Sequence, residues 1–210
     1  MPIARTKEEL VEQFRIDSIQ EAALRVIARK GLSAASMQEI AEEAGIAKGT
    51  LYLYFQNQED LLRKTVEQAF GRLADELNAA LEGGGAYLER LERQFRAKTQ
   101  FLENNVALLR LYAAAMSPEG AGQHPASCGR SQSPHFQRYF QRLQAFLAEA
   151  MEAGEVRRMR ADRLALLLEE GFMAILLARL HEPAPPPVDE EISWLMEMLR
   201  EGITVQRSRA

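Results

Sequence analysis

One segment, residues 36–62, limits the possible fold of this chain more than any other. It reads SMQEIAEEAGIAKGTLYLYFQNQEDLL and holds two short helical patterns separated by Gly45. Ile40 and the alanines that follow it form an apolar face on the first, while Leu51 and Phe55, four residues apart, form one on the second. Glycine permits the sharp turn through which two short helices cross steeply. The segment therefore predicts a helix-turn-helix.

The second helix of this unit has an exposed side suited to nucleic acid. Its outward candidates are Lys48, Thr50, Tyr52 and Tyr54, and Gly49 allows close approach of the backbone. Lysine offers a cation to phosphate or guanine, and hydroxyl groups bond phosphate oxygens. Because the second helix of such a unit enters the major groove, the pattern predicts a DNA-binding head. The alternative is that the two tyrosines only pack within the head.

The same segment resembles the DNA-binding signature of the tetracycline-repressor (TetR) family. The resemblance covers roughly residues 14–62. It is carried by Ile40-Ala41, Ala44-Gly45-Ile46, Gly49-Thr50-Leu51-Tyr52, Tyr54-Phe55 and Leu61-Leu62, with Ala22-Ala23, Ile27-Ala28 and Gly31 upstream. Beyond these residues, the chain is similar to the family only in its length and helical pattern.

The resemblance implies a homodimeric, ligand-responsive transcription regulator, more often a repressor than an activator, and not an enzyme. It implies an all-α fold of about nine helices, with a three-helix head at residues 1–56 and a helical effector-binding and dimerisation domain at residues 57–210. Because a two-fold dimer reads two half-sites, the operator in double-stranded DNA is expected to be palindromic. The positions that match the family's DNA contacts are Gln38, Lys48, Gly49, Thr50, Tyr52 and Tyr54.

Two features of the head depart from the family. Gln58 stands where the family often has a phosphate-binding lysine, and residues 1–56 hold seven cationic against eight acidic side chains, a net charge of −1. With few cations to displace counterions, we expect a shallow salt dependence of DNA binding. The same features motivate an alternative, a helical interaction or ligand-binding module that has lost sequence-specific DNA binding.

Composition places the chain among water-soluble proteins of the cytoplasm. Its 210 residues are 47% hydrophobic and 27% charged, with a formal net charge of −4. We expect no membrane association, because residues 1–7 lack the apolar run of a signal peptide and the longest apolar run, 172–178, is too short to span a bilayer. The single cysteine, Cys128, cannot form an intramolecular disulfide, which favours a reducing compartment.

Helical patterns extend over most of the chain. Ser36 is a good N-cap, because Glu39 three residues later completes a capping box. A long loop is predicted at residues 117–133, and a stiff connector at the proline run 183–187. The other predicted helices are Glu9 to Lys30, Asn57 to about Leu81 before a glycine triplet, and about 87–104, 106–116, 134–153, 160–181 and 188–206.

The last two helices predict a dimer interface, which in the family is a four-helix arrangement. Each carries an apolar stripe, and the first of them is apolar on a second side as well, so it needs two burial partners. The pattern fits one large intrachain core equally well, and the family resemblance favours the dimer. The interface candidates are Leu164, Leu168, Gly171, Ile175, Ala178, Ile192, Leu195, Met196, Leu199 and Ile203.

The family's effector pocket lies among helices four to eight, and aromatic and methionine side chains are frequent there. They favour a small hydrophobic effector, such as an acyl chain or a drug-like aromatic molecule. The candidate lining residues are Phe70, Phe101, Leu102, Leu109, Tyr112, Met116, Phe136, Phe140, Met173 and Leu177. The polar candidates are Gln100, Asn104, Asn105, Arg110, His124, His135 and Arg138. Each of these residues can also be an ordinary core or surface side chain.

The sequence predicts no catalytic residues, cofactor or metal. A di-iron site in a helical bundle needs Glu-x-x-His pairs, and none of His124, His135 and His181 has a glutamate three residues before it. Cys128 lies in the same region as two of these histidines, but the spacing fits no zinc motif. An enzyme is therefore not expected.

Overall fold

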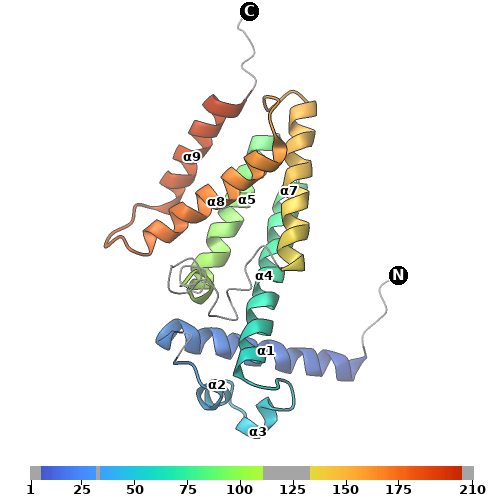
Figure 1. The fold of residues 1–210 in the computed structure, drawn as a ribbon, viewed down its shortest axis with the longest axis vertical. Coiled ribbons are helices and arrows are strands. Elements are labelled where there is room, and N and C mark those ends of the chain that lie inside the picture. Colours follow the sequence, from blue (N-terminus) through green and yellow to red (C-terminus); the bar gives the residue numbers. More distant parts are fainter. Residues whose placement is uncertain (1–5, 32–33, 111–132, 205–210) are drawn as a thin grey trace, which may run out of the picture. The chain divides into compact units, whose positions relative to one another are not determined.

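Helices account for nearly all the regular structure in the described part of the chain, and the all-α prediction is confirmed (Figure 1). The computed structural model describes residues 6–31, 34–110 and 133–204. Outside the helices, these ranges contain one isolated β-bridge, between Val156 and Thr204. The helices are α1 (Lys7–Lys30), α2 (Met37–Glu43), α3 (Lys48–Leu51), α4 (Gln58–Glu82), α5 (Tyr87–Asn104), α7 (Pro134–Glu152), α8 (Ala161–Arg179) and α9 (Val188–Ile203).

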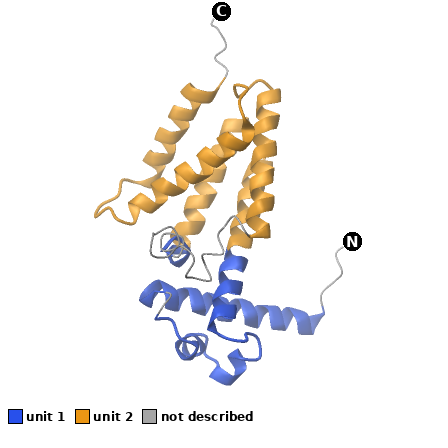
Figure 2. Ribbon diagram, in the orientation of Figure 1, with its two compact units in different colours: residues 1–69, 105–129 blue, residues 70–104, 130–210 orange. Residues whose placement is uncertain are grey.

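The chain divides into two compact units (Figure 2). Unit 1 comprises residues 1–69 and 105–129, and unit 2 comprises residues 70–104 and 130–210. The division falls inside α4, so this helix contributes its first half to unit 1 and its second half to unit 2. The boundary predicted between residues 56 and 57 lies one residue before α4 and stays a prediction.

Helix α1 begins two residues earlier than the sequence pattern predicted, because Thr6 caps it. The Thr6 hydroxyl accepts a hydrogen bond from the backbone N–H of Glu9, and the Glu9 carboxylate accepts one from the N–H of Thr6. This reciprocal pair satisfies two donors at the helix start. At the other end, Gly31 has φ of 81° and ends the helix as predicted. The buried side of α1, with Ile19 and Ile27, faces the core of unit 1.

Helix α4 begins as the sequence predicted. The Asn57 side chain accepts a hydrogen bond from the N–H of Asp60 at 2.9 Å, which caps the first turn. The helix ends at Glu82, one residue beyond the predicted Leu81 and directly before the glycine triplet. Three consecutive glycines disfavour further helix because each loses much backbone entropy on folding.

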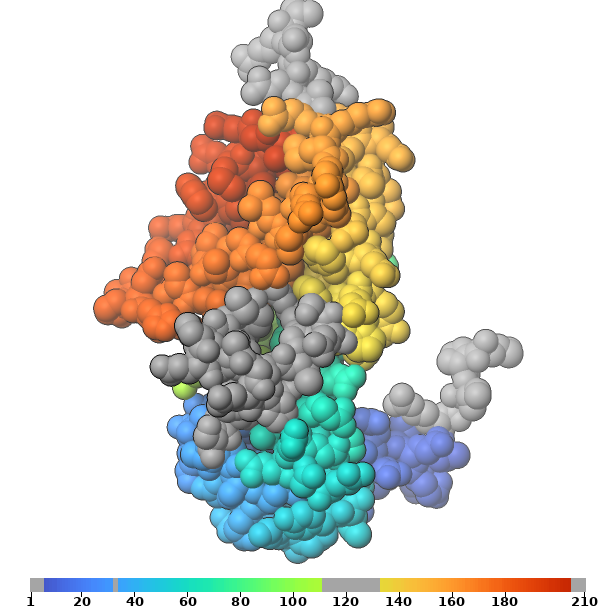
Figure 3. Space-filling view, in the orientation of Figure 1, coloured from blue at the N-terminus to red at the C-terminus, as the bar shows by residue number. Residues whose placement is uncertain are grey.

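Unit 2 is a bundle in which α7 packs on α8 and α5 packs on α9. Figure 3 shows the orange surface of α8 lying directly beside the yellow surface of α7. The rings of Phe95 on α5 and Phe172 on α8 are 4.6 Å apart at their centroids, in the buried interior. Gly154, with φ of 73°, follows the end of α7 and allows the chain to turn toward α8.

Two predicted segments fall largely outside the described residues. Residues 106–110 are helical, as predicted, while the rest of the helix predicted to residue 116 and the loop predicted at 117–133 lie almost wholly beyond the described ranges. Among the described helices, none combines the length and apolarity needed to cross a bilayer.

Candidate functional site

The turn between α2 and α3 has the geometry of a helix-turn-helix. Gly45 adopts φ of 68°, a left-handed conformation that favours glycine, and its N–H donates to the carbonyl of Glu42 at 3.1 Å. The N–H of Ile46 then donates to the carbonyl of Ala41 at 3.0 Å. These two bonds end α2 and redirect the chain, so that α3 starts three residues after the glycine.

Buried apolar side chains hold the two short helices together. Ile40 and Ala41 on α2 are buried, as predicted, and so are Leu51 and Phe55 at and beyond the end of α3. Helix α3 is one turn long and continues as hydrogen-bonded turns, in which the N–H of Phe55 still donates to the carbonyl of Leu51. A helix this short depends on packing for its stability, so these buried residues fix the position of its exposed side.

The exposed side of α3 carries the residues predicted to contact DNA. Lys48, Gly49 and Tyr52 are exposed, while Thr50 and Tyr54 are half-buried. No atom lies within 4 Å of the position that a Gly49 side chain would occupy, so the backbone here is open to a close approach. Gln38, the sixth predicted residue, is exposed on α2 and donates from its amide to Glu42 at 2.7 Å.

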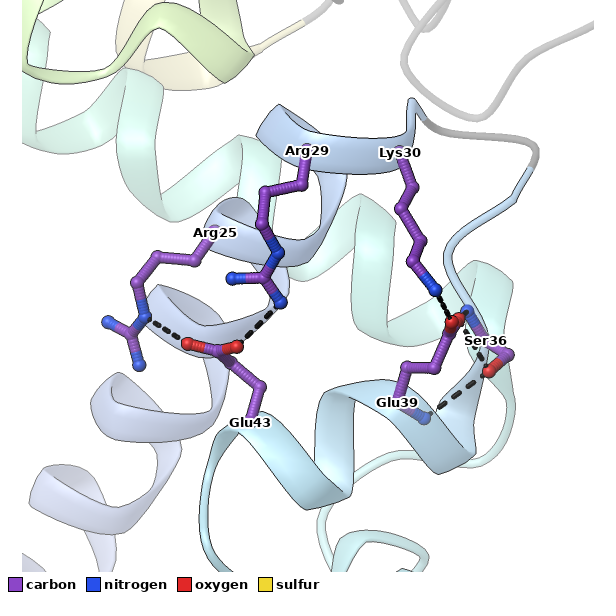
Figure 4. A network of polar contacts seen from close by, with 6 residues as sticks. All are labelled: Arg25, Arg29, Lys30, Ser36, Glu39 and Glu43. Atoms are coloured by element: carbon purple, nitrogen blue, oxygen red, sulfur yellow. Dashed lines mark hydrogen bonds and ion pairs between the residues drawn. The ribbon is translucent and has the colours of Figure 1, made fainter.

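Ion pairs between α1 and α2 brace the head (Figure 4). Glu43 on α2 accepts hydrogen bonds from Arg29 at 2.6 Å and from Arg25 at 2.8 Å, and both guanidinium groups reach down from α1. These two arginines, Arg29 first, lower the pKa of the Glu43 carboxyl. Helices α1 and α2 also pack through their apolar faces, and these ion pairs help to fix the angle between the two helices.

The capping box predicted at the start of α2 is present and is joined by a cation. Glu39 accepts a hydrogen bond from the N–H of Ser36, whose hydroxyl accepts one from the N–H of Glu39 at 3.3 Å. Lys30 at the end of α1 bonds the same carboxylate. The bond from Lys30, followed by those from Ser36, lowers the pKa of Glu39 to about 2.

Gln58, the departure from the family pattern, is engaged within the head. Its amide nitrogen donates to the backbone carbonyl of Ala35, just before α2. The side chain is half-buried. A neutral amide in this place ties the start of α4 to the start of α2 and supplies no cation for a phosphate.

The predicted effector residues are spread over the core and its edge. Phe101, Leu102, Leu109 and Met173 are buried, while Phe70, Phe136, Phe140 and Leu177 are half-buried. Leu109 belongs to unit 1 and the others to unit 2. The rings of Phe136 and Phe140 stack with centroids 6.0 Å apart. Tyr112 and Met116, together with His124 and Cys128, lie outside the described residues.

The other polar candidates for effector binding are at or near the surface. Gln100, Asn104, Arg110 and Arg138 are exposed, and Asn105 and His135 are half-buried. Arg110 donates to the carbonyl of Ala28 at 2.9 Å within unit 1. Over residues 6–31, 34–110 and 133–204, no group of three or more His, Cys, Asp and Glu side chains is placed to hold a metal ion.

A buried polar cluster in unit 2 was missed by the sequence reasoning. Lys98 on α5 bonds the carboxylate of Glu169 on α8, and their side chains are 0% and 2% exposed. The Tyr139 hydroxyl on α7 donates to the same Glu169 oxygen at 2.9 Å and accepts from the amide of Gln94. Lys98 also lies 5.9 Å from the centre of the Phe172 ring. The side-chain oxygen of Gln94 is buried and has no hydrogen-bond partner among the described residues.

A signal for this cluster was present in the helical spacing. Lys98 follows Leu91 by seven positions and Gln94 by four, which places it on the apolar side of α5. Glu169 similarly follows the buried Ala165 by four positions and precedes the buried Phe172 by three, which places it on the apolar side of α8. A charged residue on the apolar side of a helix is uncommon unless it is paired. The positions of Lys98 and Glu169 therefore indicate that each has a partner, and only the fold identifies it.

The predicted dimer residues lie mostly inside the single chain. The buried ones are Leu164, Leu168, Ile192, Leu195, Met196 and Leu199; Gly171, Ile175 and Ile203 are half-buried, and Ala178 is exposed. The large apolar side chains that α8 and α9 expose are instead Leu166, Leu167, Trp194 and Met198. The interface stays a prediction, and these four residues widen the surface open to a partner.

The head is similar in sequence to known regulators. Residues 19–65 match the model of the family described as bacterial regulatory proteins, tetR family. The HTH-type transcriptional regulator BetI of Rhizobium meliloti (strain 1021) is 34% identical over 113 residues, which are 52% of this chain and 56% of that protein. The matched segment spans about half the length of the curated relatives.

Two solved structures have the same fold over most of the chain. The fatty acid degradation regulator FadR from Bacillus halodurans has a TM-score of 0.74 at 22% identity, with 90% of this chain and 95% of that chain covered. The transcriptional regulator FadR from Bacillus subtilis, in complex with stearoyl-CoA, has a TM-score of 0.73 at 20% identity, with 89% and 98% covered. At these identities, the likeness shows the fold alone.

The capped entry helix, the glycine turn and the exposed short helix define a helix-turn-helix head of the DNA-binding class. With the match over residues 19–65, this head carries the DNA-binding segment of the TetR family of bacterial regulatory proteins.

Proposed function

We propose that this chain is a ligand-responsive, DNA-binding transcription regulator that acts as a repressor in the cytoplasm. The observation that carries the proposal is the exposed side of α3. Lys48, Gly49 and Tyr52 are open to solvent, while Leu51 between them is fully buried and holds the turn in place. Such a turn presents a cation, a hydroxyl and an accessible backbone together, which suits contacts with a major groove and its phosphates.

The proposal includes a homodimer that reads a palindromic operator. Helices α8 and α9 leave Leu167 67% exposed and Trp194 57% exposed. Large side chains exposed on adjoining helices are typical of surfaces that bind another protein. Leu167→Glu is expected to shift the protein from dimer to monomer in analytical ultracentrifugation, whereas Glu152→Gln, an exposed position at the end of α7, is not. A dimer of unchanged stability in Leu167→Glu would contradict this interface.

We propose an elongated acyl compound as the effector, bound in unit 2. FadR from Bacillus subtilis, which has the same fold, was solved with stearoyl-CoA. In this chain, the half-buried ring pair of Phe136 and Phe140 offers apolar surface that suits an acyl chain. Stearoyl-CoA is expected to change DNA affinity by at least about tenfold. A ligand that binds one conformation of the protein more tightly also shifts the equilibrium of DNA binding. Free coenzyme A is the control, and equal effects of the two would contradict an acyl effector.

The first experiment is selection of genomic DNA fragments by the purified protein, followed by sequencing. A shared palindrome is the expected result. On that operator, Lys48→Ala and Tyr52→Ala are each expected to weaken binding about tenfold to hundredfold. Arg158→Ala removes an exposed cation of unit 2 and is expected to leave binding unchanged. No enrichment at low salt, with or without stearoyl-CoA, would favour an interaction module without DNA binding.

A further inference from the structure

A groove of about 420 Å³ opens on the head, where α1 meets the turn and α3. Its lining residues come from both sides and are Phe14, Arg15, Ser18, Ile19, Ala44, Ile46, Thr50 and Tyr54. Three of them carry hydroxyl groups and one is an exposed cation. Thr50 and Tyr54 also belong to the predicted DNA surface, so the groove continues that surface onto α1.

Arg15 is held in the groove by a residue of the turns that follow α3. Its Nη1 atom lies 3.5 Å from the Tyr54 hydroxyl, 39 positions later in the chain. No carboxylate of the described residues pairs with it, and its side chain is exposed. A guanidinium presents five N–H donors in a fixed fork, so a single bond to Tyr54 leaves most of them available to a ligand.

Most other cations of the head are already engaged. Arg25, Arg29 and Lys30 are bound to carboxylates of α2. Of the cations described before residue 56, this leaves Lys7, Arg15 and Lys48 without a carboxylate partner. Because the head is acidic overall, Arg15, which lies in the groove beside the predicted DNA surface, is expected to contribute much of the attraction to a phosphate there.

We infer that this groove is a binding site for the sugar-phosphate backbone of DNA, in which Arg15 contacts a phosphate and Tyr54 positions Arg15. The inference rests on the proposed function, and it adds a contact from α1 that lies outside the helix-turn-helix. Arg15 matches the fork geometry that a phosphate prefers. The hydroxyls of Ser18 and Thr50 line the same groove and can bond phosphate oxygens.

Phe14 gives the groove an apolar rim that fits the same ligand. Phe14 is 75% exposed, so most of its surface is not packed within the head. A deoxyribose next to a bound phosphate offers apolar surface that such a ring can cover. Phe14→Ala is therefore expected to weaken DNA binding without changing its salt dependence, since no charge is removed.

The test is the salt dependence of operator binding for Arg15→Gln, measured by fluorescence anisotropy with the full chain. Each phosphate contact contributes about 0.9 to the log–log salt slope, so the variant is expected to have a slope shallower by about 0.9 per head. At about 0.1 M salt, this corresponds to a loss of roughly eightfold in affinity per head, equal on operator and unrelated DNA. Arg15→Lys is expected to keep the slope, because it keeps the charge.

Lys7→Gln is the matched control, since it removes a charge from the same helix about 12 Å away. At physiological salt, that distance exceeds the Debye length of about 8 Å, so long-range attraction to Arg15's phosphate is screened. Tyr54→Phe is expected to weaken binding in the presence of Arg15 and to have a smaller effect in Arg15→Gln, because its hydroxyl acts through Arg15.

An unchanged slope in Arg15→Gln, or an equal loss in Lys7→Gln, would overturn the groove as a phosphate site while leaving the regulator function standing. Failure of the unaltered protein to bind any DNA would overturn the proposed function together with this inference. Circular dichroism spectra and melting temperatures of the variants are expected to match those of the unaltered protein, because Arg15 and Lys7 are exposed.

Discussion

The two units of this protein both carry surface ion pairs, such as Arg96 with Glu92 in unit 2, but unit 2 also holds a buried pair. In unit 1, the ion pairs lie at the surface, as in the bond between Arg29 and Glu43. In unit 2, Lys98 and Glu169 are paired in the interior, beside Tyr139 and aromatic rings. Exposed pairs are weakened by water and salt, whereas a buried pair loses its hydration and depends on every partner being present. Removal of one charge is therefore expected to destabilise unit 2 at its buried pair more than unit 1 at a surface pair.

Breaking the buried pair is expected to give the largest effect. Glu169→Leu leaves Lys98 charged in the interior without its carboxylate, and should lower the free energy of unfolding by about 3–5 kcal/mol. Urea unfolding followed by circular dichroism measures this loss. The double variant Lys98→Met/Glu169→Leu removes both charges and should recover most of the stability. A single variant within about 1 kcal/mol of the unaltered protein would show that the pair is not desolvated in solution.

A backbone change in the head should have an intermediate effect. Gly45→Ala forces a side chain into the left-handed region, where φ is 68°, and should cost about 1–2 kcal/mol. Gly49→Ala is the matched control, because Gly49 is helical and nothing lies within 4 Å of the added carbon. Thermal melting compares the two. Equal destabilisation by both would mean that the turn geometry is not what limits the stability of the head.

The smallest effect is expected from the exposed network, and it depends on pH. Lys30 and Ser36 lower the pKa of Glu39 to about 2 from an ordinary value of 4.5. In this range the unfolded chain binds a proton that the folded head does not, so stability is present above about pH 4.5 and is lost as pH falls toward about 2. Glu39→Gln should flatten the melting temperature over this range.

Glu42→Gln is the control for that measurement, because among the described residues the carboxylate of Glu42 bonds only the neutral amide of Gln38. It should leave the pH dependence of the melting temperature close to that of the unaltered protein. If Glu39→Gln and Glu42→Gln behaved alike, the bond to Lys30 would not persist in solution. Raising the salt concentration should shrink the difference between the two variants, since exposed pairs are screened.

The head was largely predictable from the sequence because its determinants are local. The cap at Ser36, the stop at Gly31 and the turn at Gly45 each depend on residues within four positions of one another, and the structure contains all three. The miss at Thr6 was also local, since a threonine followed by Glu9 is the same capping pattern. By contrast, the pairing of Arg15 with Tyr54 joins α1 to the segment after α3, and no spacing rule predicts it.

In the bundle, the sequence predicted apolar stripes but not their directions. Leu168 and Leu195 were interface candidates whose spacing fitted an intrachain core equally well. Both are buried within the single chain, whereas Leu167 and Trp194 are exposed. When a helix is apolar on two sides, periodicity alone does not say which side faces the chain's own core and which side faces a partner. The packing of α7 on α8 and of α5 on α9 shows which helices share the core of unit 2, and a partner for the exposed sides stays a prediction.

The sequence by itself determined the helices, their caps and the helix-turn-helix, because hydrogen bonds and side-chain spacing within a few residues fix these features. Only the tertiary structure decided which charges meet. Lys98 and Glu169 are 71 positions apart, and Arg15 and Tyr54 are 39 apart. Pairings at such separations depend on how whole helices pack. The physical reason is that a helix pattern states which side of a helix is apolar, while the partner of each side is set by the shape of the entire core.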